Sequence, residues 1–217
     1  MTRVQYRQEL ERLKNDVLEM GELSNISIIN CIAALEKQDV KIAAQVFEDG
    51  KRVDELEFAI EKDCMRLLAL QQPMASDLRF IVTCLKIIGE LDRISDHSQD
   101  IANIAIELAG QVYFKPHIDI PRMREACQDI LKIGLEAFKT GDISHLMELQ
   151  EKEDLVDALY DQIRREAITF MIEDPKLMRI ASHFSFIAQH LERIADHGCN
   201  IGSRVYYMIT GDRIKIE

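Results

Sequence analysis

The sequence contains few of the residues that end helices and form tight turns. Among 217 residues there are only 9 glycines and 4 prolines. An all-β fold needs many turns, so this composition favours helices. Hydrophobic residues make up 47% of the chain, which is ample for a packed core. At 25.0 kDa the chain is long enough for one large domain or two small ones.

Other absences exclude several classes of function. The chain has no surplus of basic residues, and its formal net charge of -11 argues against nucleic acid as the main partner. The five cysteines are far apart and form no C-x-x-C pair, which fits a reducing cytosol rather than a disulfide framework or a zinc site. We find no secretion signal and no run of roughly 18 apolar residues that would span a membrane. We therefore expect a cytoplasmic protein with no direct membrane insertion.

The sparse prolines and glycines divide the chain into long segments with helical periodicity. Lys115–Pro121, bounded by prolines, separates two groups of three such segments. We expect an all-α fold of two tandem three-helix bundles, with domains at residues 1–114 and 115–217. The predicted helices cover about residues 3–37, 39–71, 75–112, 121–139, 142–172 and 175–210.

An internal repeat supports this division. Leu91–Ile101 and Leu191–Ile201 are identical at six of eleven positions, at an offset of 100 residues. Val53–Leu56 matches Val156–Leu159 at an offset of 103, which a three-residue change in the connecting loops would explain. The chain therefore reads as two copies of one unit.

Each copy keeps acidic residues four positions apart on a helix. At 100° per residue, these acids lie opposite the apolar stripe that includes Leu91, Ile94 and Ile101. An outward acid is usually part of a solvated face. Here, however, like charges at i,i+4 repel by about 0.2–0.5 kcal/mol per pair. We expect no lysine or arginine to offset that repulsion, so the pattern favours a bound cation or a specific partner.

The ligand chemistry of such a site is that of hard oxygen donors. Carboxylates suit Mg²⁺, Ca²⁺, Mn²⁺ or iron, whereas zinc prefers histidine and cysteine. His97 and His197 each follow a key aspartate but point about 100° away from it, which favours a supporting role over direct ligation. His117, His145, His183 and His190 show no metal-ligand spacing.

Catalytic readings find little support. No Glu is followed three residues later by a His, as a ferritin-like di-iron site requires. The chain has no G-x-S-x-G, Walker A or G-x-G-x-x-G motif. Acids on the convex face of a bundle would also lack a water-excluding pocket. We therefore expect no enzyme, although a cleft beside Asp96 would reopen the question.

The segment Leu67–Arg79 reads LLALQQPMASDLR and runs on to LDRISDH at Leu91–His97. Together these stretches closely resemble the PhoU family of phosphate-transport regulators, and the resemblance covers essentially the whole chain. It implies two tandem three-helix bundles with surface metal clusters, of iron in some members, at E/D-x-x-x-D motifs. Carried over by position, the expected metal ligands are Asp54, Asp92, Asp96 and Asp100 in the first bundle and Glu153, Asp157, Glu192 and Asp196 in the second. Asn200 stands where the first bundle has Asp100, and Gly50 stands where the second has Glu153, unless Asp49 or Glu48 reaches in.

The resemblance also implies a function without catalysis. Its members damp phosphate-starvation signalling by contacting the ATPase of a phosphate ABC transporter and a membrane sensor histidine kinase. We expect the same partners here, together with a homodimer. The rival interpretation is a metal-independent helical adaptor that docks basic partner surfaces on its acidic stripes.

Overall fold

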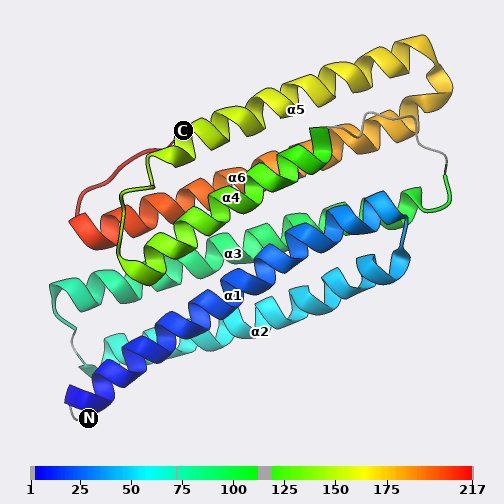
Figure 1. Ribbon diagram of the computed structural model, residues 1–217. Helices are drawn as coiled ribbons and strands as arrows, with labels where there is room; N and C mark the ends of the chain where they lie inside the picture. Colours follow the sequence, from blue (N-terminus) through cyan, green and yellow to red (C-terminus); the bar gives the residue numbers. More distant parts are fainter. Residues whose placement is uncertain (1–2, 72, 112–118, 217) are drawn as a thin grey trace.

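The computed structural model describes residues 3–71, 73–111 and 119–216 (Figure 1). These residues contain no strand. They form the α-helices α1 (Arg3–Lys37), α2 (Val40–Gln71), α3 (Ala75–Leu108), α4 (Asp119–Thr140), α5 (Glu148–Glu173) and α6 (Met178–Thr210), with a short 3₁₀ helix at Pro175–Leu177. The predicted all-α fold of two three-helix bundles is confirmed. The expected boundary between residues 114 and 115 lies outside the described residues.

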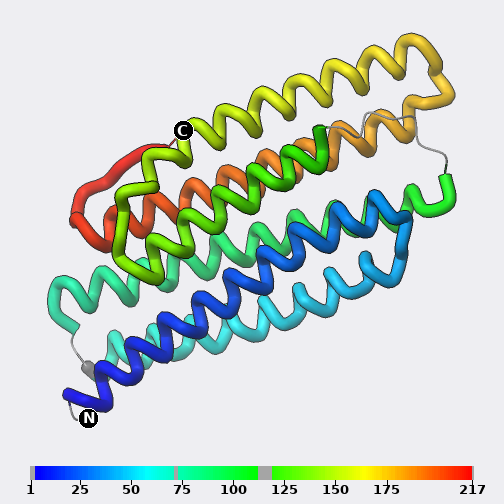
Figure 2. The backbone as a smooth tube through the Cα atoms, viewed as in Figure 1, coloured from blue at the N-terminus to red at the C-terminus, as the bar shows by residue number. Residues whose placement is uncertain are grey.

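Each half of the chain packs as an antiparallel bundle, α1–α3 in one and α4–α6 in the other (Figure 2). The two bundles meet along α3 and α6, with a smaller contact between α1 and α4. The apolar stripe predicted on α3 lies in the core, and Leu91, Ile94 and Ile101 are fully buried. On α6 the equivalent Leu191 and Ile194 are buried as well. The duplicated segment therefore lies on the helix of each bundle that makes the larger contact with the other bundle.

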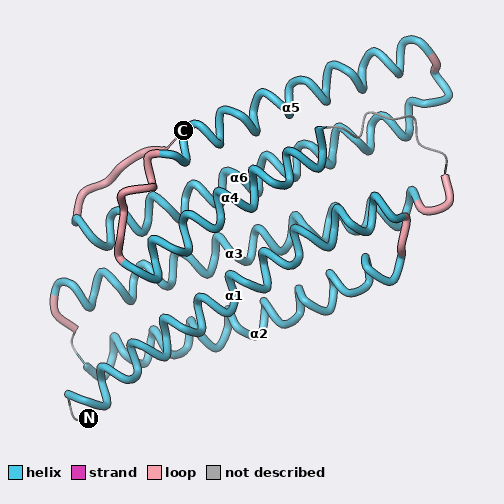
Figure 3. Tube along the Cα trace, in the orientation of Figure 1, coloured by secondary structure: helices cyan, strands magenta, loops and turns pink. Residues whose placement is uncertain are grey.

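Two helix ends differ from the sequence prediction by four residues or more (Figure 3). α3 stops at Leu108 rather than near 112, because Gly110 adopts a left-handed conformation with φ of 76°. α5 begins at Glu148 rather than 142. Here the Asp142 Oδ1 atom accepts the Ser144 N–H at 2.9 Å, which holds a turn in place of the first helical turn.

One helix, α1, is apolar enough over an 18-residue window to cross a membrane by length and composition. Within the fold, 56% of that window is buried. The sequence reading underestimated this stretch, whose apolar residues include Val17, Met20 and Ile28 and form part of the hydrophobic core. Core helices meet the same criterion, so the burial of α1 accounts for its hydropathy.

α4 and α6 approach closely at glycines. A Cβ atom on Gly198 would lie 2.6 Å from Ile130 Cγ2 and 3.6 Å from the Leu131 backbone nitrogen. In the first bundle the repeat offsets of 100 and 103 place Ser98 and Ser27 at the positions of Gly198 and Ile130. The second bundle therefore packs the large side chain of Ile130 against a glycine, whereas the first bundle has a serine at each of the two equivalent positions.

This packing makes Gly198→Ala a destabilising change. We expect a loss of about 1–3 kcal/mol, because the β-branched Ile130 is fully buried and has little freedom to move aside. Chemical denaturation followed by circular dichroism measures it. Gly89→Ala is the matched control, since nothing lies within 4 Å of a Cβ there. That substitution should instead stabilise by about 0.5–1 kcal/mol. Equal effects at the two glycines would contradict the packing argument.

Candidate functional site

The carboxylates of the second bundle gather where α5 packs against α6. We call Glu153, Asp157, Glu192 and Asp196 the second acidic patch. Glu153, Asp157 and Asp196 line a surface hollow of about 510 Å³, together with Gln150, Asp154, Cys199, Asn200 and Ile216. Glu153 is only 8% exposed. The expectation that these acids lie on an open convex face is therefore wrong for Glu153, whereas Asp157 is exposed.

Mutual repulsion and burial act on these carboxyl groups. Burial, followed by the charges of Asp157 and Asp196, raises the pKa of Glu153 above its usual range. The pKa of Asp157 is raised by burial and by Asp196 and Asp154. Burial and Asp196 also raise the pKa of Glu192, although Arg193 opposes the shift. Raised pKa values at Glu153, Asp157 and Glu192 mean that the fully ionised form of these groups is under electrostatic strain.

The carboxylates of the first bundle form a similar group between α2 and α3. We call Asp54, Glu57, Asp92 and Asp96 the first acidic patch. Burial, then Asp96 and Asp54, raise the pKa of Asp92. Burial and Asp92 likewise raise the pKa of Glu57. The sequence interpretation overlooked Glu57, although its position three residues after Asp54 places both on one helical face.

The expected lack of compensating bases is wrong at two positions. The Arg93 Nη1 atom lies 3.1 Å from Asp96 Oδ2, three residues along α3. The equivalent Arg193 lies 3.0 Å from Asp196 Oδ2 and 3.3 Å from Glu192 Oε2. These pairs are partly solvent-exposed, so each offsets little of the repulsion. They do show that both copies hold the central aspartate in the same way.

Both alternative ligands suggested for the position of Gly50 have partners of their own. The Glu48 carboxylate pairs with Lys51 Nζ at 2.7 Å. The buried Asp49 accepts a hydrogen bond from Gln45 Nε2 at 3.0 Å. The first patch therefore lacks a counterpart of the buried Glu153, and the two patches differ in their ligand sets.

The second patch fits a hard cation by the chemistry of its donors. It offers four carboxylates on two helices, and oxygen-rich sites suit Mg²⁺, Ca²⁺, Mn²⁺ or iron. The Glu192 Oε2 atom is buried and has no hydrogen-bond partner, although Arg193 lies nearby. A cation would satisfy that atom and relieve the repulsion that raises the pKa of Glu153. The first patch offers the same type of donor with one buried carboxylate fewer.

The raised pKa of Asp92 predicts a pH dependence of stability in metal-free protein. Because folding raises this pKa, the folded state binds more protons than the unfolded state between the two values. Stability relative to Asp92→Asn should therefore fall as pH rises from about 3.9, the ordinary Asp value, through the raised value. Thermal melts of both proteins in metal-free buffer between about pH 3.5 and 7 measure the difference. A wild type that gains stability relative to Asp92→Asn as pH rises would contradict the repulsion.

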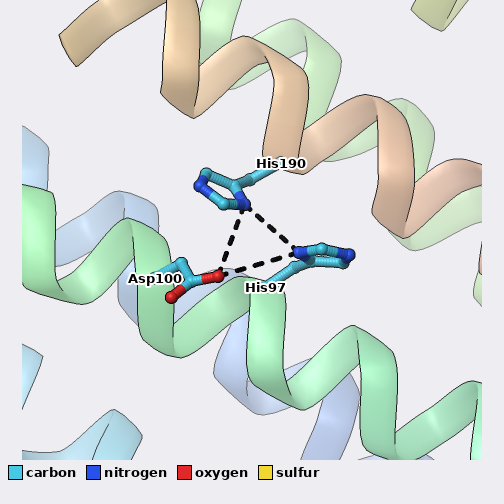
Figure 4. Close-up of side chains that lie close together, drawn as sticks. All are labelled: His97, Asp100 and His190. Carbon is cyan, nitrogen blue, oxygen red and sulfur yellow. Dashed lines mark hydrogen bonds and ion pairs between the residues drawn. The ribbon is translucent and has the colours of Figure 1, made fainter.

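Asp100, expected as a ligand of the first bundle, lies close to two histidines. Its Oδ2 atom lies 3.6 Å from His190 Nδ1 and 3.9 Å from His97 Nδ1. The two histidine Nδ1 atoms lie 3.2 Å apart (Figure 4). Asp100 and His97 lie on α3 and His190 lies across from them on α6. Asp100 therefore faces the seam between the bundles, beside His190, which showed no metal-ligand spacing in the sequence.

The surroundings of His97 and His190 disfavour the charged form of both imidazoles. Burial, together with His190 and His197, lowers the pKa of His97. Burial also lowers the pKa of His190, although Asp100 opposes the shift. A spacing of seven residues between His183, His190 and His197 could have indicated from sequence that these rings share one face of α6. No pattern in the sequence indicates which helix faces these rings.

Comparison with known proteins agrees with this architecture. The family model described as the PhoU domain matches residues 17–105 and 120–205, once in each bundle. The chain belongs to the PhoU family. The family resemblance inferred from sequence is thereby confirmed.

Full-length relatives and solved structures of the family are similar throughout. A PhoU homolog of Aquifex aeolicus, named as a phosphate-specific transport system accessory protein, is 38% identical over 95% of this chain and 94% of its own. A Clostridium acetobutylicum protein with the same name is 33% identical over 100% of both chains. The crystal structure of PhoU from Pseudomonas aeruginosa has a TM-score of 0.91 and 30% identity, covering 95% of this chain and 100% of that one. A phosphate transport system regulatory protein PhoU from Streptococcus pneumoniae has a TM-score of 0.88 and 27% identity, over 97% and 99%.

Proposed function

We propose that this protein is a non-enzymatic regulator of phosphate uptake and phosphate-starvation signalling. Membership of the PhoU family supports a role as an accessory protein of a phosphate transport system, the role named for its relatives. In this proposal the chain acts in the cytoplasm as a homodimer. Its partners are the ATPase of a phosphate ABC transporter and a phosphate sensor histidine kinase.

The observation that carries the proposal is the second acidic patch. Glu153, Asp157 and Asp196 share one hollow. Burial with mutual repulsion raises the pKa of Glu153, Asp157 and Glu192. A bound iron, Mn²⁺, Mg²⁺ or Ca²⁺ ion would supply positive charge that joins α5 to α6. Without it, the carboxylates repel and the two helices are held mainly by their apolar faces. The first patch would act in the same way on α2 and α3, with Asp54, Asp92 and Asp96 as ligands.

The chemistry of the hollow favours binding over catalysis. Cys199 lines it, but burial and the charges of Glu153, Asp196 and Asp157 raise the pKa of this thiol to about 12. The thiol therefore stays protonated at neutral pH and is a poor nucleophile. A patch of repelling carboxylates is better suited to hold a cation or to dock a basic partner surface.

The alternative is a metal-independent adaptor, and the arginine pairs favour it. Arg193 and Arg93 already contact Asp196 and Asp96, so each patch keeps part of its charge compensated without a metal. In this case the remaining carboxylates would contact lysines and arginines of the transporter ATPase or the kinase directly. Such contacts steer association and depend on salt.

Capture of tagged protein from phosphate-replete cells tests both proposals. Mass spectrometry identifies the captured proteins, and elemental analysis of the same sample measures its metal. We expect the ATPase and the kinase with the wild type, and their loss with Asp196→Asn. Glu11→Gln, at an exposed position on α1, is the matched control and should keep both partners.

The outcomes separate the two proposals. Loss of metal and partners together in Asp196→Asn supports the metal-dependent form. Loss of partners at unchanged metal content supports the adaptor. Absence of both the ATPase and the kinase from folded wild-type protein would contradict the regulatory function itself.

A further inference from the structure

The seam between the bundles carries a row of histidines and acids. α3 and α6 run antiparallel, and His183, His190 and His197 recur every seven residues on α6. They meet acids of α3 in turn: His183 Nε2 lies 3.4 Å from Glu107, His190 Nδ1 lies 3.6 Å from Asp100, and His197 Nδ1 lies 2.8 Å from Glu90. The seam is therefore a polar strip along the largest contact between the two halves of the molecule.

The middle of this strip differs from its ends because two histidines share one acid. His97 Nδ1, His190 Nδ1 and Asp100 Oδ2 lie 3.2–3.9 Å from one another. Ligand atoms bound at about 2.05 Å to a tetrahedral ion lie about 3.3 Å apart. The three donors are thus already spaced for a single ion, and Figure 4 shows them turned toward a common point. The two histidine side chains are 24% and 23% exposed, so an ion can reach them.

The internal repeat supplies a natural comparison. At an offset of 100, the counterparts of His97, Asp100 and His190 are His197, Asn200 and Glu90. Those residues also meet, but Glu90 accepts hydrogen bonds from His197 at 2.8 Å and from Asn200 at 3.3 Å. Arg204 lies 3.7 Å from Glu90 and adds a cation. That group is therefore complete as it stands.

The group of His97 is not completed by an arginine in this way. The position equivalent to Arg204 is Ile104, which offers no charge to Asp100. In this group the imidazoles of His97 and His190 face each other. In the other copy the imidazole of His197 faces the carboxylate of Glu90. Two histidines and one carboxylate form a ligand set typical of borderline divalent transition metals.

We propose that His97, Asp100 and His190 bind one divalent transition-metal ion of the Zn²⁺ or Fe²⁺ type at the α3–α6 seam. The ion would bind α3 through His97 and Asp100 and α6 through His190, and so fasten the first bundle to the second. Water or a further ligand would complete its coordination. This site differs in place and in ligand chemistry from the two acidic patches, which offer carboxylates alone. It does not depend on the proposed regulatory function.

Zinc titration of the full-length, chelator-stripped protein tests the site. Nitrogen-15 NMR of labelled histidines reports binding at each imidazole, so zinc held only by carboxylates is recognised as such. We expect the His97 and His190 signals to change together at one equivalent of Zn²⁺. His190→Gln and Asp100→Asn should weaken this binding about tenfold or more. Zinc should also raise the melting temperature of the wild type more than that of Asp100→Asn.

Matched variants keep the test independent of folding. Asp100→Asn places at this position the residue that position 200 already carries in the second copy, so the fold should tolerate it. His145→Gln changes an exposed histidine between α4 and α5 and should leave zinc affinity at His97 and His190 unchanged. Unchanged imidazole signals in zinc-loaded wild-type protein would overturn the proposal. So would equal zinc affinity in the wild type and in folded His190→Gln protein.

Discussion

Replacing Leu191 with alanine is expected to lower the free energy of unfolding by about 2–5 kcal/mol. Leu191 is fully buried in the second bundle, so truncation loses its transfer free energy and leaves a cavity. The Leu191 carbonyl, which the substitution leaves in place, accepts a hydrogen bond from Cys127 Sγ of α4 at 3.2 Å. Denaturant unfolding followed by circular dichroism measures the loss.

Leu91→Ala should cost a similar amount, because the first copy reproduces the same environment. Leu91 is equally buried, and its carbonyl accepts a hydrogen bond from Ser24 Oγ of α1 at 3.3 Å. Leu70→Ala is the control: Leu70 is 67% exposed, so its truncation should change stability by no more than about 0.5 kcal/mol. A large loss at Leu191 with none at Leu91 would show that the two bundles do not share one packing scheme.

The paired contacts from Ser24 and Cys127 show which features the two copies share and which they change. Both residues satisfy the same need, a donor to the carbonyl of the buried leucine, with different side chains. What must remain similar in each copy is the apolar stripe and the central aspartate. Those are the features that periodicity reports, and so the six helices and their grouping could be predicted.

The site could be predicted only in part, for physical reasons. Helical phase places Asp92 and Asp96 on one face, but it does not show which helix covers that face. Burial of Glu153 and the hollow beside it depend on how α5 packs on α6, which a one-helix projection omits. Asp100 faces His190 across a contact between bundles, 90 residues away in sequence. No local pattern encodes that pairing.

Metal loading at the second acidic patch is the other change from which we expect a large effect. In chelator-stripped protein, Mn²⁺ at about 100 times its dissociation constant should stabilise the fold by about 2.7 kcal/mol. Glu153→Gln should remove most of that gain, because it deletes the buried carboxylate of the patch. Thermal melts across a Mn²⁺ titration measure both proteins.

The same substitution should have the opposite effect without metal. The raised pKa of Glu153 shows that its charge is opposed by burial and by Asp157 and Asp196. Glutamine has nearly the same shape and no charge, so metal-free Glu153→Gln should be more stable than the wild type at neutral pH. The two stability curves should therefore cross as Mn²⁺ is added. Glu151→Gln, at an exposed position on the same helix, should follow the wild type throughout.

The crossing distinguishes a cation site from a merely acidic surface. If the carboxylates only docked a partner, removing one charge would stabilise the isolated protein at every Mn²⁺ concentration, and the curves would stay apart. Asp54→Asn in the first patch should leave most of the Mn²⁺ gain intact, since Gly50 stands where the second patch has Glu153. An equal loss in Asp54→Asn and Glu153→Gln would instead show that the two patches contribute equally to the Mn²⁺ gain. The number of carboxylates, rather than the burial of one of them, would then determine how strongly each patch binds Mn²⁺.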